Sequence, residues 1–292
     1  MGTLAASALI SGLGLGSMYG LLALGFYITF SVSGTVNFAQ GSSMMLGAVL
    51  AYTFAVTWGF PLLISILLSL LFCAAYGVLV ERVAVRPFAS RGSNAWLMST
   101  VALGIIADNS VLFTFGKEPR GFIMPWANAA TQVGGANVSA LQVAIPAVGL
   151  FLAFSLNVFS RKTRLGKAML AVVQNPDAAR LMGVNVPLAI SAAYAMSTLF
   201  AGAAGVMIAP LFNVHSDMGT VFGLKAFAVA ILGGIGNAWG VMLAGLIFGV
   251  VEALITALLG SGYTQILTFT LVIVALAIRP NGLFGRAEVM KV

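Results

Sequence analysis

Long apolar runs separated by short polar segments dominate the pattern of this chain. The long runs cover about 4–32, 62–80, 95–115, 138–159, 188–210, 238–259 and 263–278, and shorter ones cover about 44–57 and 224–232. A helix crosses a hydrocarbon core about 30 Å thick with roughly 20 apolar residues. The pattern therefore predicts an all-α, polytopic integral membrane protein. We expect about eight transmembrane helices plus broken or half-helices in a single domain over residues 1–292.

Small residues recur at helical spacing in two of these runs. Gly12, Gly16 and Gly20 fall on one face of the first run, and Gly236, Gly240, Gly245 and Gly249 offer another such face along the run at 238–259. Small residues at this spacing let a second helix approach closely inside a membrane. Both faces are therefore predicted to be helix-packing surfaces.

Composition strengthens the membrane assignment and orients the chain. Only 7% of residues are charged and the mean hydropathy is +1.06, whereas a soluble domain has roughly 25% charged residues. The segments 81–93 and 160–187 and the tail after 278 carry three, five and three of the fourteen basic residues. By the positive-inside rule all three are expected in the cytoplasm, with the protein in the cell inner (plasma) membrane. The segments 116–136 and 211–222 then face the other side, and the net charge of +7 does not indicate nucleic-acid binding.

Two polar, Gly-rich breaks interrupt the apolar pattern. Gly34-x-x-Asn37 is followed by Gly41, and Gly234-x-x-Asn237 is followed by Gly240. An interrupted helix in each half of a transporter indicates a substrate path, because unwound backbone is tolerated at membrane depth only beside protein or a water-filled cavity. Ordinary Gly/Asn turns at the membrane surface are the alternative. The candidate residues of a translocation path are Asn37, Gln40, Gly41, Asp108, Gly234, Gly236 and Asn237.

Charged residues inside apolar runs are the other candidates. Asp108 lies within the run at 95–115 and Glu252 within the run at 238–259. An intramembrane carboxylate is a functional candidate unless it is held by a neighbouring helix. For Asp108 both interpretations stay open, and for Glu252 the structural one is preferred. Lys225 begins a half-helix and is expected at the membrane interface.

The basic segment 161–187 contains a predicted short helix over about 175–182. Asn175 and Asp177 suit a helix start, Pro176 suits its first turn, and Gly183 suits its end. Such a helix between apolar spans would present a surface to the cytoplasm. Arg161 to Lys167 would contact either a partner or the anionic membrane lipid surface.

Enzymatic chemistry is not indicated. The Gly166-Lys167 pair is followed by Ala168, so the P-loop pattern for ATP is not met. One cysteine, Cys73, and one histidine, His215, do not make a metal cluster. We expect neither catalytic residues nor a cofactor nor a metal site.

Several stretches together resemble the H-type permease subunits of branched-chain amino acid ABC importers. They are GTVNFAQG at 34–41, RLGKA at 164–168, NPDAARLMGVN at 175–185, KAF at 225–227, ILGGIGN at 231–237 and RPNGLFG at 279–285, with Glu81-Arg82 and Arg86-Pro87. The resemblance spans nearly the whole chain in order. Gln40 departs from it, because relatives often have His there, and glutamine does not titrate near neutrality.

The resemblance implies how the chain would work. Residues Asn175, Asp177, Ala178, Ala179, Arg180 and Gly183 would form the coupling helix that docks on cytoplasmic ABC ATPase subunits. A second permease subunit, M-type or a second copy, would complete the path. A periplasmic substrate-binding protein would dock on 116–136 and 211–222. Related permeases serve urea or short amides, so substrate stays open, and a secondary transporter working without an ATPase is the alternative from another class.

Overall fold

The structure is a computed structural model that describes residues 2–123, 130–133 and 136–285. Seven helices in these ranges are long and apolar enough to cross a membrane. They are α1 (Gly2–Ser33), α3 (Leu62–Leu79), α5 (Trp96–Phe115), α6 (Ala140–Lys162), α9 (Val186–Ile208), α11 (Ala238–Leu259) and α12 (Ser261–Ile278). The short helix α2 (Gln40–Tyr52) and the shorter apolar helix α10 (Met218–Gly233) complete the bundle. The all-α polytopic fold with half-helices is confirmed.

Smaller elements connect these helices. The π-helical turns η1 (Thr53–Thr57) and η2 (Val80–Val85) extend α2 and α3, and α4 (Arg86–Ala89) follows η2. The hairpin β1 (Ala130–Val133) and β2 (Ala136–Ser139) is antiparallel, with Ala130 opposite Ser139. The helices α7 (Arg164–Gln174) and α8 (Pro176–Leu181) lie between α6 and α9.

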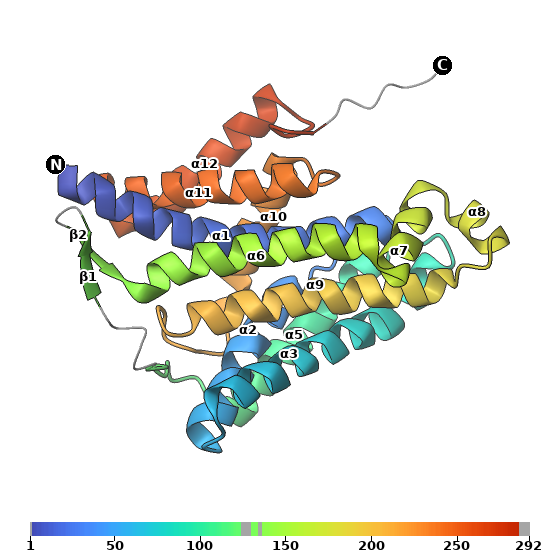
Figure 1. Cartoon of the computed structure of the whole chain (residues 1–292), viewed down its shortest axis with the longest axis horizontal. Helices are drawn as coiled ribbons and strands as arrows, with labels where there is room; N and C mark the ends of the chain where they lie inside the picture. Colours follow the sequence, from blue (N-terminus) through green and yellow to red (C-terminus); the bar gives the residue numbers. More distant parts are fainter. Residues whose placement is uncertain (1, 124–129, 134–135, 286–292) are drawn as a thin grey trace.

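The helix α1 lies in the interior of the bundle, in contact with α6, α9, α10 and α11 (Figure 1). Its glycine face meets the glycine face of α11, as the spacing predicts. A Cβ on Gly12 would lie 2.7 Å from the Cα of Val250, and one on Gly245 would lie 2.6 Å from the Cα of Gly20. Because these glycines have no side chains, the two backbones pack directly against each other.

The three basic segments lie at one end of the bundle. Arg86, after η2, donates from Nη2 to the carbonyl oxygen of Pro187 at the start of α9, 3.4 Å away. The tail packs on the end of α10, where the Leu283 amide donates to the Leu232 carbonyl at 2.6 Å. The start of α1 and the β-hairpin lie at the opposite end (Figure 1). The basic residues Arg286 and Lys291 of the tail lie outside the described residues.

The two segments predicted to share the opposite face meet there. Arg120 and Val214 exchange two backbone hydrogen bonds, of 2.9 and 2.8 Å. This bridge joins the segment after α5 to the segment after α9. Residues 124–129 and 134–135 of the segment at 116–136 lie outside the described ranges.

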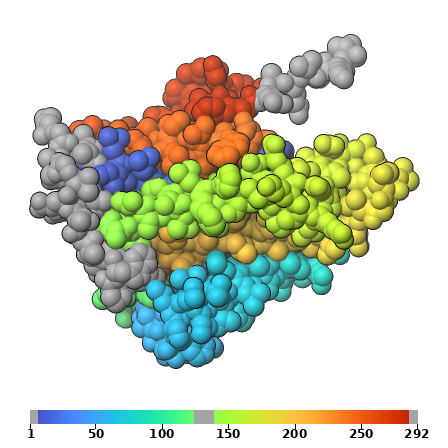
Figure 2. Space-filling view, viewed as in Figure 1, coloured from blue at the N-terminus to red at the C-terminus, as the bar shows by residue number. Residues whose placement is uncertain are grey.

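The segment 161–187 is more ordered than a basic loop. The helix α6 continues to Lys162, and α7 begins directly after Thr163, whose Oγ1 accepts from the Gly166 amide at 3.0 Å. The buried residues of α7 are Gly166, Met169 and Val172, which recur every three residues along one face. The sequence interpretation treated residues 161–174 as a loop because Arg164 and Lys167 are charged. It did not consider the apolar face formed by Gly166, Met169 and Val172. The α7–α8 segment projects beyond the end of the bundle (Figure 2).

Candidate functional site

The helices α2 and α10 both begin inside the bundle. Gln40, the first residue of α2, contacts Leu22 of α1. Near the start of α10, the Phe222 ring lies 6.0 Å from the Tyr19 ring, centroid to centroid, close to the middle of α1. Further along α10, the Phe227 ring lies 5.5 Å from the Phe26 ring. The helix α10 therefore runs parallel to α1.

The starts of α2 and α10 cross through backbone contacts. A Cβ on Gly41 would overlap the Gly219 carbonyl oxygen, and a Cβ on Gly219 would overlap the Gly41 carbonyl oxygen. A Cβ on Gly223 would lie 2.8 Å from the Cα of Gly41. Only glycine fits at this crossing, which explains the predicted importance of Gly41.

Gln40 joins three helices through its side-chain amide. Its Nε2 donates to the Ser197 carbonyl at 3.0 Å and to the Leu22 carbonyl at 3.4 Å. Its Oε1 lies 3.0 Å from the Ser197 hydroxyl and accepts from Nδ2 of Asn37 at 3.4 Å. Both Asn37 and Gln40 are fully buried. Their amides stabilise the unwound entry to α2 rather than face an open space.

A cavity of about 290 Å³ lies beside the crossing. Residues that line it include Phe26, Phe38, Gly41, Asp108, Gly219 and Phe227. Two of the predicted path residues, Gly41 and Asp108, therefore share one cavity. The Oδ1 atom of Asp108 is buried and accepts no hydrogen bond from the described residues.

The second predicted break lies elsewhere, at the basic end of the bundle. Gly234 has φ +80° and packs against Gly285 of the tail. Asn237 caps α11 by accepting from the Gly240 amide at 3.2 Å, and its Nδ2 donates to the Phe284 carbonyl at 3.3 Å. Gly236 is exposed. These residues do not line the 290 Å³ cavity but a separate one of about 630 Å³.

The helix predicted over about 175–182 is present as α8. The Oδ1 of Asn175 accepts from the amides of Asp177 and Ala178, each at 3.0 Å. Gly183 ends the helix with φ +82°, and its amide donates to the Arg180 carbonyl at 3.0 Å. The capping residues thus have the local roles that their types indicated.

The residues of α8 and of its C-terminal end differ in their exposure to solvent. Ala178 is exposed, whereas Ala179 retains only 4% of its accessible surface and packs into the bundle. The most exposed apolar side chains of the segment are Leu181, at 89%, and Met182, at 84%. Sequence reasoning treated these two only as helix formers. The sequence signal that could have identified them as a contact surface is the presence of two large apolar residues at a helix end in an otherwise polar segment.

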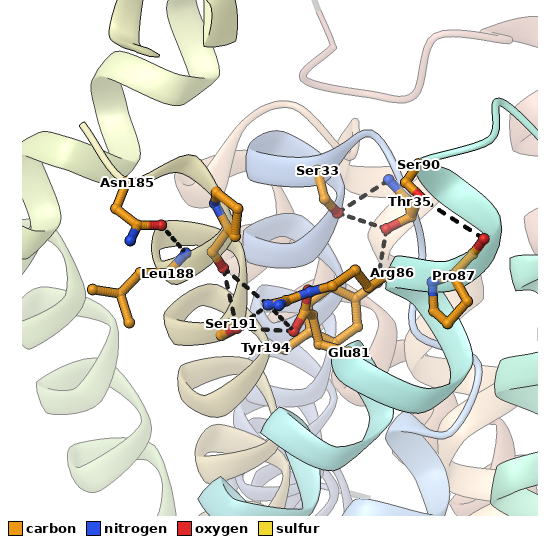
Figure 3. Close-up of polar contacts among 11 residues, drawn as sticks. Ser33, Thr35, Glu81, Arg86, Pro87, Ser90, Asn185, Leu188, Ser191 and Tyr194 are labelled. Atoms are coloured by element: carbon orange, nitrogen blue, oxygen red, sulfur yellow. Dashed lines mark hydrogen bonds and ion pairs between the residues drawn. The ribbon is translucent and has the colours of Figure 1, made fainter. Parts of the chain in front are cut away.

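A polar network fixes the start of α9, directly after α8 (Figure 3). Arg86 donates from Nε and Nη2 to the two carboxylate oxygens of Glu81, at 2.9 Å each, and from Nη2 to the Ser191 hydroxyl, also at 2.9 Å. The Ser191 hydroxyl lies 2.8 Å from Glu81 Oε2. Beside it, the Tyr194 hydroxyl lies 2.7 Å from that of Thr35. These contacts connect α9 to η2 and to the entry of α2.

The position of Lys225 corrects a prediction. It was expected at the membrane interface, but α10 begins at Met218, so Lys225 lies well inside the helix. Its Nζ lies 2.6 Å from Oε1 of Glu252 on α11, and both side chains are buried. Interpretation from the sequence started the helix six residues too late, because it took 211–222 as a loop. Glu252 joins α10 to α11, in agreement with the structural role preferred for it.

These features define a class of protein: a helical membrane bundle with two short helices that start in its interior and a capped helix exposed at one end. The chain matches the family model described as "Branched-chain amino acid transport system / permease component" over residues 8–276, and it belongs to that family. The match describes a permease component of a transport system rather than an enzyme.

Individual relatives agree with the family match. The chain is 31% identical to the high-affinity branched-chain amino acid transport system permease protein LivH of Escherichia coli K12, over 97% of this chain and 96% of the relative. It is also 31% identical to BraD of Pseudomonas aeruginosa, the permease protein of the same kind of system, over 97% of each chain. Among solved structures, PsaBC from Streptococcus pneumoniae in complex with Fab has a similar fold. The TM-score is 0.52 at 14% identity, over 94% of this chain and 92% of that one.

Proposed function

We propose that this chain is the permease subunit of an ATP-driven ABC importer and forms half of a translocation path for branched-chain amino acids. The observation that carries the proposal is the family match over residues 8–276. The names of LivH and BraD, which are similar to nearly the whole chain, support the substrate class. The chain would form one transmembrane permease domain over residues 1–292.

The path would pass the crossing of α2 and α10. Gly41 and Asp108 share the cavity there, and Asn37 and Gln40 hold the unwound backbone that leads into α2. Gly234, Gly236 and Asn237 would contribute to the cytoplasmic opening, since they line the 630 Å³ cavity at the basic end. Unwound backbone beside a cavity is the arrangement that membrane transporters use for substrate sites.

The helix α8 would be the coupling helix. Asn175, Asp177 and Gly183 set its ends, Ala178 and Arg180 lie on its exposed surface, and Ala179 anchors it. We add Leu181 and Met182, whose exposed apolar side chains suit a docking groove on an ATPase subunit. Movement of α8 would reach the bundle through α9, which the Arg86 network ties to η2.

The assembly would contain cytoplasmic ABC ATPases, a second permease subunit and a periplasmic substrate-binding protein. We favour an M-type subunit over a second copy as the permease partner. The basic end of the bundle, including the C-terminus, would face the cytoplasm of the cell inner membrane, because basic residues concentrate in cytoplasmic loops. The segments joined by the Arg120–Val214 bridge would then receive the binding protein.

Reconstitution tests this function. The chain is placed in proteoliposomes with candidate ATPases, a candidate second permease and a candidate binding protein, and uptake of radiolabelled leucine, isoleucine and valine is measured with and without ATP. ATP-dependent uptake of these amino acids is expected. ATP-dependent uptake of urea or a short amide instead would contradict the substrate class, and uptake by this chain without an ATPase would contradict the importer class.

A further inference from the structure

We propose that the Asp108 carboxylate binds the α-ammonium group of an amino acid as it passes through the 290 Å³ cavity. The inference rests on the proposed function and deepens it, because it assigns a specificity-determining contact within the path.

The first observation is that Asp108 has no ion-pair partner among the described residues, and that a side chain interacting with its carboxylate is the neutral hydroxyl of Ser42. It lies on α5 inside a membrane-spanning helix, and its Oδ1 is buried without a hydrogen bond from the described residues. The ion pairs of the described residues do not include Asp108. The hydroxyl of Ser42, which also lines the cavity, donates to the Gly104 carbonyl at 3.2 Å.

An unpaired carboxylate at this depth is costly. A charged side chain at the bilayer centre costs about 2.5–3.5 kcal/mol on insertion scales, and such residues mark substrate or ion pathways. The other buried carboxylates differ: Glu252 is paired with Lys225, and Glu81 is paired with Arg86. Of these three acidic side chains, only Asp108 has no cationic partner among the described residues.

The remaining lining suits the apolar side chain of such a substrate. Phe26, Phe38 and Phe227 form a connected aromatic wall, with Phe227 5.1 Å from Phe38 and 5.5 Å from Phe26, ring centroid to centroid. An aromatic face attracts an ammonium group and also packs against a branched aliphatic side chain. The volume is near the lower end of ligand cavities, roughly 300–1,000 Å³, which suits a small molecule.

This geometry distinguishes between substrate classes. An amino acid presents an ammonium group that can form a charge-assisted hydrogen bond to Asp108, whereas urea and short amides offer only neutral N–H groups. The carboxylate therefore favours an amino acid over a neutral amide at the same cavity.

The test uses the complete importer in proteoliposomes. Asp108→Asn keeps the size of the side chain and removes its charge, and Asp108→Glu keeps the charge. The control is Asn109→Ala, which removes a polar side chain from the adjacent, exposed position of α5. Leucine uptake, ATPase stimulation by the loaded binding protein and the thermal midpoint of each variant are measured.

We expect Asp108→Asn to lower the leucine uptake rate about tenfold or more, the factor that the loss of one charge-assisted contact produces. Asp108→Glu should retain more uptake than Asp108→Asn, and Asn109→Ala should match the unmodified importer. Loaded binding protein should still stimulate ATPase activity in Asp108→Asn, and its thermal midpoint should be unchanged.

Two results would overturn the inference in distinguishable ways. Normal leucine uptake by Asp108→Asn, or an equal loss in Asp108→Glu and Asp108→Asn, would remove Asp108 from substrate contact and leave the proposed function intact. ATP-dependent uptake of urea or an amide in place of leucine by the unmodified importer would overturn both.

Discussion

The Lys225 ammonium lies 2.6 Å from the Glu252 carboxylate, and this ion pair joins α10 to α11 inside the bundle. The pair fixes one face of α10, while the opposite contacts of this helix lie at the α2 crossing. Neither Tyr19 Oη nor Glu252 Oε2 has a hydrogen-bond partner among the described residues. The Lys225–Glu252 ion pair is therefore the main polar interaction that offsets the desolvation of these two buried charges.

Lys225→Met is expected to destabilise the protein strongly, because it leaves the Glu252 charge buried without a partner. Breaking a buried pair costs about 3–5 kcal/mol, and replacing both partners by apolar residues recovers most of that loss. Thermal unfolding in detergent micelles should show a lower midpoint for Lys225→Met than for the Lys225→Met/Glu252→Met double variant. Asp177→Asn, which breaks the exposed Asp177–Arg180 pair, is the control and should change stability by less than about 1 kcal/mol. Equal midpoints for the single and double variants would contradict this account.

Gly41→Ala should weaken the crossing of α2 and α10. The added Cβ overlaps the Gly219 carbonyl, and overpacking of this kind costs about 1–3 kcal/mol. Gly262→Ala is the matched control, since its Cβ would meet open space at an ordinary φ. Thermal midpoints and leucine uptake should fall for Gly41→Ala and stay near those of the unmodified protein for Gly262→Ala. A normal midpoint and normal uptake for Gly41→Ala would show that the crossing has more space than its geometry indicates.

Ala178→Glu and Ala179→Glu should fail in different ways. Ala178 is exposed, so a glutamate there should leave the thermal midpoint unchanged and reduce the ATP-driven uptake that docking on the ATPase supports. Ala179 is buried, so a glutamate there should lower the thermal midpoint, because a charge is forced into a packed contact. Uptake, binding-protein-stimulated ATPase activity and thermal midpoint are compared for the two. Normal uptake by Ala178→Glu would contradict the coupling role of α8.

The exposed apolar pair at the end of α8 gives a second test of docking. Leu181→Asp and Met182→Asp should each reduce co-purification of the ATPase subunits, because an apolar docking contact becomes charged. The matched control is Leu188→Asp, on an exposed position of α9 just beyond the segment. Unchanged co-purification of all three variants would place the ATPase contact elsewhere.

Arg86→Lys should loosen the start of α9. A lysine cannot reproduce the bidentate contact with Glu81, and it also loses the bond to Ser191. Because Arg86 is partly exposed, we expect a modest lowering of stability, about 1 kcal/mol, and reduced coupling of ATP hydrolysis to uptake. Arg82→Lys, on an exposed position of the same turn, is the control. Equal effects of the two substitutions would argue against a specific role for the network.

The fold and the short capped helix could be predicted because each depends on local sequence. Apolar run length determines which segments span a membrane, and Asn175, Pro176 and Gly183 are sufficient to place α8. Glycine spacing on α1 and α11 likewise identified their contact faces. These signals act within one helix or one turn, where residue type and position largely decide the conformation.

The remaining features depend on contacts between segments distant in the chain. The partner of Lys225 lies 27 residues away, and the network of Arg86 reaches Ser191, 105 residues away. The similar sequences of the two Gly/Asn breaks were also misleading about where each break lies in the bundle. Asn37 lies in the buried stretch that leads into α2, whereas Asn237 caps a helix at the end of the bundle. The residue types are shared, and the packing around them differs.

The crossing at Gly41 and Gly219 has a mechanical consequence. Helices that interlock through large side chains must repack those side chains before they can rotate. At this crossing the contact is between the backbones of glycine residues, so no side chains need to repack. The crossing can therefore act as a pivot point. The helices α2 and α10 can tilt about it while the distance between them at Gly41 and Gly219 stays fixed. A tilt of a few degrees displaces the far end of each helix much more than the crossing itself, so it would reshape the cavity beside the crossing while the Gly41–Gly219 contact is kept.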